Sequence, residues 1–112
     1  MSLELHLSAK QLGVLVFHFN ALEKEPMHSR QGKVARSILD KLILKFRKKY
    51  LDVVNLPAKT NKGKIKKYKF SIDYHDGHYL ETFIDIALNF AMNEYDRNVL
   101  NFIKSNLNQQ LV

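Results

Sequence analysis

The sequence predicts an α+β fold in which a two-stranded sheet is covered on one face by four helices. Two short segments alternate apolar and polar residues, the period of a half-buried strand. Four longer segments repeat apolar residues every three or four positions, as amphipathic helices do. With 112 residues, of which 46% are hydrophobic, the chain is expected to form one domain, residues 1–112.

The first half of the chain predicts one strand followed by two helices. Leucines alternate with polar residues over positions 3–7, which predicts the strand. Ser8 and Gln11 have capping-box spacing, so a helix is expected over about residues 9–24. Ser29 is the next N-cap candidate, and a helix of about 25 residues should follow it. Its apolar face consists of Val34, Ile38, Leu39, Leu42, Ile43, Phe46, Tyr50 and Val53.

The second half predicts the same order of elements. Aromatic and aliphatic residues alternate with polar ones over positions 68–74, which predicts a second strand. The tripeptide His75-Asp76-Gly77 predicts a turn in which the aspartate caps a helix over residues 78–92. A break at positions 93–96 then separates this helix from a last one, which runs through Val99 to Leu111.

Matching apolar positions suggest an internal duplication with pseudo-repeats at 3–50 and 68–112, joined by a basic loop at 55–67. Seven positions match at an offset of 67 residues, and four later ones match at 61. The first set pairs Leu3, Leu5, Leu7, Leu12, Val16, Phe17 and Phe19 with Phe70, Ile72, Tyr74, Tyr79, Phe83, Ile84 and Ile86. Chance similarity of two amphipathic patterns is the alternative. Paired strands would leave two open outer edges, to which a second copy of the chain could add.

The positive charge is concentrated in one quarter of the chain. The net charge is +7, yet residues 41–69 contain eleven basic residues and only one acidic residue, Asp52. Residues 70–112 contain six acidic and two basic residues. The expected binding face consists of Lys41, Lys45, Lys48, Lys59, Lys62, Lys64, Lys66 and Lys67.

This lysine-rich face predicts a small binding protein that contacts the phosphate backbone of DNA or RNA. Lysine is a compact point charge, which suits phosphate contacts better than bidentate reading of bases. The alternative is a protein-interaction module, an inhibitor or adaptor that docks on an acidic protein partner. A homodimer is a further possibility, because the first helix is apolar almost all round: Val14 and Phe17 lie off its main apolar stripe.

The histidines offer a weak case for a metal site. His75 and His78 lie three residues apart, close to Asp73 and Asp76. Two imidazoles and two carboxylates could bind a divalent metal. Turn chemistry explains the Asp76-Gly77 pair without a metal, so neither a metal nor another cofactor is expected.

Catalytic and membrane functions are not expected. The chain has no cysteine, no G-x-S-x-G or H-E-x-x-H motif and no Walker-type phosphate loop, so we expect a non-enzymatic protein. Its longest apolar stretch, residues 12–17, is too short to span a bilayer. With no recognisable secretory signal, the expected location is the cytoplasm, without membrane contact.

Overall fold

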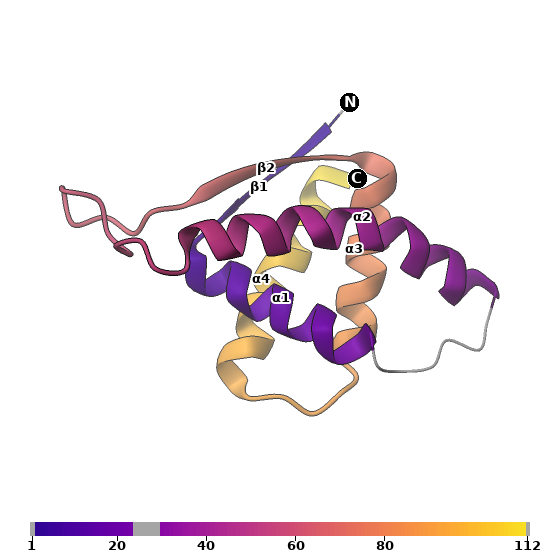
Figure 1. Ribbon diagram of the computed structural model, residues 1–112. Helices are drawn as coiled ribbons and strands as arrows, with labels where there is room; N and C mark the ends of the chain where they lie inside the picture. The colour runs from indigo at the N-terminus through magenta and orange to yellow at the C-terminus, as the bar shows by residue number, and fades with distance from the viewer. Residues whose placement is uncertain (1, 24–29, 112) are drawn as a thin grey trace.

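The computed structural model describes residues 2–23 and 30–111 and confirms the α+β architecture (Figure 1). A two-stranded antiparallel sheet packs on four helices. The predicted N-cap at Ser29 lies outside the described residues. In chain order the elements are β1 (Ser2–Leu7), α1 (Ala9–Glu23), α2 (Arg30–Val53), β2 (Tyr68–Asp73), α3 (Tyr74–Ala87) and α4 (Glu94–Leu111).

The sheet has one apolar face and one polar face. Its antiparallel register runs from Ser2 opposite Asp73 to Leu7 opposite Tyr68. The alternation in both strands sends the leucines of β1, together with Phe70 and Ile72 of β2, into the core. The helices cover this face because two strands alone cannot bury enough apolar surface to be stable.

Four phenylalanines join the sheet to the helices. The Phe19 ring of α1 lies 4.3 Å from the Phe83 ring of α3, centroid to centroid, and 6.1 Å from the Phe46 ring of α2. Phe46 in turn lies 4.9 Å from Phe70 of β2. All four rings are buried, so one continuous core holds β2 and the first three helices together.

The predicted capping box at the start of α1 is confirmed. The Gln11 N–H donates to Ser8 Oγ at 3.2 Å, and the Ser8 N–H donates to Gln11 Oε1 at 2.9 Å. Val14 is buried, whereas Phe17 is 62% exposed. The core of the single chain thus accounts for Val14 and leaves the Phe17 ring exposed, and the homodimer stays a prediction.

The prediction of a turn at His75-Asp76-Gly77 before the helix is wrong. Helix α3 begins at Tyr74 and already includes these three residues. Its N-cap position is occupied by Asp73, whose side chain makes no capping hydrogen bond, and Asp76 does not cap the helix. Gly77 is buried, and a Cβ at that position would collide with Leu3 Cδ1. The glycine thus allows close packing of α3 on β1 and makes no turn.

The boundary between α3 and α4 also differs from the prediction. Helix α3 ends at Ala87 and does not extend to residue 92, and α4 already starts at Glu94, inside the predicted break. A cap accounts for the start of α4: the Asp96 N–H donates to Asn93 Oδ1 at 2.7 Å, which satisfies a free donor of the first helical turn.

Both outer edges of the sheet are blocked at their centres, although the sequence predicted open edges. On the β1 side, the Glu4 N–H donates to Gln110 Oε1 at 2.9 Å, and Gln110 Nε2 donates to the Glu4 carbonyl at 2.8 Å. On the β2 side, Lys45 Nζ donates to the Ser71 carbonyl at 2.9 Å. Side chains of α4 and α2 thus occupy backbone groups that an added strand would need.

The internal duplication stays a prediction. Glu4 lies opposite Ser71, which is 67 residues later, so a pseudo-twofold axis between the repeats would pass near this pair. The helices match less well, because α2 has 24 residues and α4 has 18. Helix α3 also follows β2 directly, whereas Ser8 separates β1 from α1.

Candidate nucleic-acid interface

The central part of the predicted basic loop, residues 58–66, forms a short hairpin, which we call the basic arm. The Lys66 N–H donates to the Ala58 carbonyl at 3.0 Å, and the Thr60 N–H donates to the Lys64 carbonyl at 2.7 Å. At the tip, Gly63 has a φ of 79°, which a residue without Cβ adopts at little cost. The arm projects from the helices at the end of α2 (Figure 1).

The lysines of the basic arm point their charges into solvent. Lys59, Lys62 and Lys64 are exposed, and Lys66 is half-buried at the base of the arm. Across residues 2–23 and 30–111, none of these four lysines forms an ion pair with a carboxylate. Their charge is therefore available to an anionic ligand.

The predicted lysines of α2 lie in a different setting from those of the basic arm. Lys41 and Lys45 line a hollow of about 190 Å³ together with Asp73 and Asp76. Lys45 also holds the Ser71 carbonyl at the edge of β2. The structure thus splits the predicted face in two, and two carboxylates offset part of the charge on α2.

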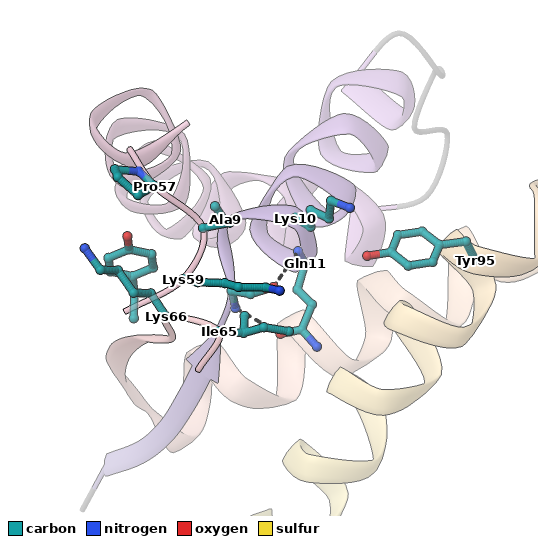
Figure 2. Close-up of a pocket in the computed structure, with 11 residues that line it drawn as sticks. Ala9, Lys10, Gln11, Pro57, Lys59, Ile65, Lys66 and Tyr95 are labelled. Atoms are coloured by element: carbon teal, nitrogen blue, oxygen red, sulfur yellow. Dashed lines mark hydrogen bonds between the residues drawn. The ribbon is translucent and has the colours of Figure 1, made fainter. Parts of the chain in front are cut away.

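A pocket of about 300 Å³ lies at the base of the basic arm (Figure 2). Its walls come from the arm and the residue before it, from the start of α1, from the start of β2 and from the start of α4. The lining residues are Ser8, Ala9, Lys10, Gln11, Pro57, Ala58, Lys59, Ile65, Lys66, Tyr68 and Tyr95. Lysines and tyrosines from separate parts of the sequence therefore meet around one cavity.

Hydrogen bonds fix the helix turn that carries Tyr95. Asp96 lies in the first turn of α4, where its Oδ2 contacts Nε2 of His18 on α1 at 3.0 Å. His18 is buried, so its role is to join α1 to α4. Together with the Asn93 cap, this contact holds the start of α4 beside α1 and places the Tyr95 side chain at the pocket.

Lysine and aromatic side chains also meet around the base of the basic arm. Lys49 Nζ lies 5.1 Å from the centre of the Tyr68 ring, and Lys67 Nζ lies 5.7 Å from the centre of the Phe102 ring. Both distances allow cation–π attraction. Lys67, predicted from the sequence as a binding residue, thus connects the arm to α4.

Sequence reasoning missed Lys10, Tyr95 and Phe102. Lys10 stands alone at the start of a helix, so charge clustering gives no signal for it. Tyr95 and Phe102 lie seven residues apart and share one helical face, and both are exposed. The sequence did contain a signal for the two aromatic residues: they lie beside Asn98 and Asn101, which are exposed. A helix face that packs on the core would not include these asparagines, so the aromatic residues beside them were candidates for surface contacts.

The four side chains considered for a metal site are not brought together. Among the described residues, no group of three or more His, Cys, Asp or Glu side chains could hold a metal ion. His75 packs against Tyr79, with ring centroids 5.0 Å apart.

On the polar face of the sheet, Lys69 forms an ion pair with Glu4. Lys69 Nζ lies 3.0 Å from Glu4 Oε1. The hydrogen bond from Lys69, together with its charge, lowers the pKa of the Glu4 carboxyl, and His6 adds to this effect. Lys69 is thus less available to a ligand than the lysines of the basic arm.

Comparison with known proteins identifies no relative of this chain. No family model, curated protein or solved structure matches the chain. Within the described ranges, no helix is both long and apolar enough to cross a membrane.

Proposed function

We propose that this protein binds nucleic acid through the phosphate backbone, with the basic arm as the main contact. The observation that supports this proposal is the projecting hairpin with its exposed Lys59, Lys62 and Lys64, none of which pairs with a carboxylate in the described part of the chain. Phosphates attract such charges and release counterions when they bind. Lysine gives little base discrimination, so affinity should depend weakly on sequence.

Salt dependence gives the expected strength of this interaction. The basic arm and its flanks provide about six phosphate contacts, so the slope of log K against log salt should be near −5 for duplex DNA. On a single strand the same contacts give a slope of about −4. We expect affinity to fall steeply with added salt on either substrate.

The test is fluorescence anisotropy of labelled oligonucleotides at several salt concentrations. The variant Lys62→Gln/Lys64→Gln removes two charges at the tip of the basic arm and should reduce the slope by about 0.7–0.9 per lost contact. The matched control is Lys41→Gln/Lys48→Gln, which removes the same net charge from α2. We leave Lys45 unchanged, because it also holds the edge of β2.

Two results would contradict the proposal. The first is absence of binding by the unaltered protein at low salt. The second is equal loss of affinity in the arm variant and the α2 control, which would mean that net charge, and not the arm, determines binding. A larger loss in the arm variant supports the proposal.

One observation favours a second candidate function for α2. Leu44 is 63% exposed and Leu51 is 73% exposed, and both lie on the outer face of the helix with Lys41 and Lys48. Exposed leucines gain nothing from phosphate contacts, whereas an acidic amphipathic helix of a protein partner would cover them. A synthetic helical peptide with a leucine face flanked by glutamates should then bind, and Leu44→Ser/Leu51→Ser should abolish that binding.

A further inference from the structure

The pocket at the base of the basic arm combines apolar walls with positive charge. Ile65 of the basic arm, Pro57 just before the arm, and the rings of Tyr68 and Tyr95 provide flat or apolar surface. Its volume of about 300 Å³ lies at the lower end of the range for small-molecule pockets, roughly 300–1,000 Å³. A single planar ring system with an attached phosphate suits this size and lining.

Two ammonium groups lie on the side of the pocket where Tyr95 is found. Lys59 extends from the arm across the pocket, and Lys10 extends from α1 near Tyr95, whose hydroxyl points toward the pocket (Figure 2). Lys66 points the other way, toward the outside of the arm (Figure 2). Lysines from two different elements thus extend toward the part of the pocket that Tyr95 lines (Figure 2).

The formal charge of the pocket comes from its lysines, and the capping box occupies two N–H groups at the start of α1. The Gln11 N–H is already bonded to Ser8 Oγ, and the Ser8 N–H is bonded to Gln11 Oε1. The groups that the pocket offers to a ligand include the ammonium groups of its lysines and aromatic carbon.

We infer that the pocket binds one unpaired base of a single-stranded nucleic acid, stacked on Tyr95, while Lys10 and Lys59 contact the neighbouring phosphates. This inference rests on the proposed nucleic-acid binding and adds the class of substrate, a single strand. Bases stack on aromatic side chains whatever their sequence, because every base has a π-face. A paired base is not accessible in this way, since both of its faces are covered within the duplex.

The surface beyond the pocket can accommodate the rest of the strand. Phe102 lies two helical turns after Tyr95 on the same face of α4 and is partly exposed, with Lys67 above its ring. The alternation of aromatic rings and lysines continues there, which is the composition of single-strand platforms. The strand is expected to run from the pocket toward Phe102.

The experiment separates stacking from charge by its choice of probes. Anisotropy is measured with an oligothymidylate of about twelve nucleotides, within the site size of small single-strand binding domains. The second probe is a strand of equal length made of abasic sites, which keeps the phosphates and lacks the bases. The third probe is a duplex of the same length.

Three variants isolate the role of Tyr95. Tyr95→Ala removes the ring, and Tyr95→Phe keeps the ring without the hydroxyl. Phe17→Ala is the matched control, because Phe17 is 62% exposed, similar to 53% for Tyr95, and does not line the pocket. Circular dichroism confirms that each variant keeps its helices.

The unaltered protein should bind the thymidine strand roughly five- to 150-fold more tightly than the abasic strand. Tyr95→Ala should lose that preference while it keeps its affinity for the abasic strand. Tyr95→Phe and Phe17→Ala should both retain the preference.

Equal binding of the thymidine and abasic strands would overturn the inference and leave the proposed backbone binding intact. Tighter binding of the duplex would do the same. Failure to bind any probe at low salt would overturn the proposed function, and the inference with it.

Discussion

Gly77 gives the sharpest test of how the helices pack on the sheet. The change is Gly77→Ala, which adds one methyl group in the first turn of α3. A Cβ at this position would collide with Cδ1 of Leu3, a side chain that is fully buried in β1. Either Leu3 must change rotamer in a packed core, or α3 must move away from the sheet.

The expected magnitude follows from two opposing effects. Alanine favours a helix over glycine by about 1 kcal/mol at most. Overpacking a core by one methyl group costs about 1–3 kcal/mol. Because the added Cβ would overlap Leu3 Cδ1 deeply, the cost should lie in the upper part of this range, about 2–3 kcal/mol. After the gain in helix propensity is subtracted, we expect the free energy of unfolding to fall by about 1–2 kcal/mol.

Urea denaturation followed by circular dichroism measures this difference, and a second background identifies its cause. Leu3→Val shortens the side chain that the new methyl group would meet. In the Leu3→Val background, Gly77→Ala should cost less than it does in the unaltered protein. An alanine variant that is as stable as the original, or an equal cost in both backgrounds, would refute the collision.

Three further changes test other contacts of the fold. Gln110→Ala removes the two hydrogen bonds from the Gln110 side chain to the backbone of β1 and should lower the free energy of unfolding by about 1 kcal/mol. The control Gln109→Ala, at an exposed neighbouring position, should change the free energy of unfolding little. His18→Ala leaves a carboxylate of α4 without its partner, at a cost of about 1–3 kcal/mol. Hydrogen exchange should then be faster at residues 94–98, and unchanged exchange would contradict the role given to this contact. Lys69 lowers the pKa of Glu4 in the folded state, so the pair stabilises the protein above the unfolded pKa of the carboxyl and loses this effect as the pH falls through the folded pKa. The stability difference between Glu4→Gln and the unaltered protein should therefore be larger at about pH 7 than at about pH 3, as measured by urea denaturation.

The elements of the fold were largely predictable from local pattern. Alternation identified both strands, and apolar spacing identified all four helices. The Ser8–Gln11 capping box was also readable, because its two hydrogen bonds join residues only three apart. Errors arose at Gly77 and Asn93, where the deciding contact or cap was not recognised from composition.

The candidate interface was predictable in its charge and not in its shape. Lys59, Lys62 and Lys64 stand out in the sequence because they cluster within a few residues. The projecting hairpin on which these lysines lie is formed by backbone hydrogen bonds across the loop, and their sequence pattern did not indicate it. Lys45 bonds to the edge of β2 through the Ser71 carbonyl, 26 positions away, and a contact over that separation cannot be read from local pattern.

The sequence by itself determined the class of fold, the segment that carries the charge and the residues available for the core. These properties depend on composition and on spacing within one helix or strand, so they can be read along the chain. Only the tertiary structure decided that Gly77 is a packing residue, that the sheet edges are blocked and that Lys10, Lys59 and Tyr95 surround one pocket. The physical reason is that each of these features is a contact between elements far apart in sequence, and such contacts exist only after the shared core has fixed the elements against one another.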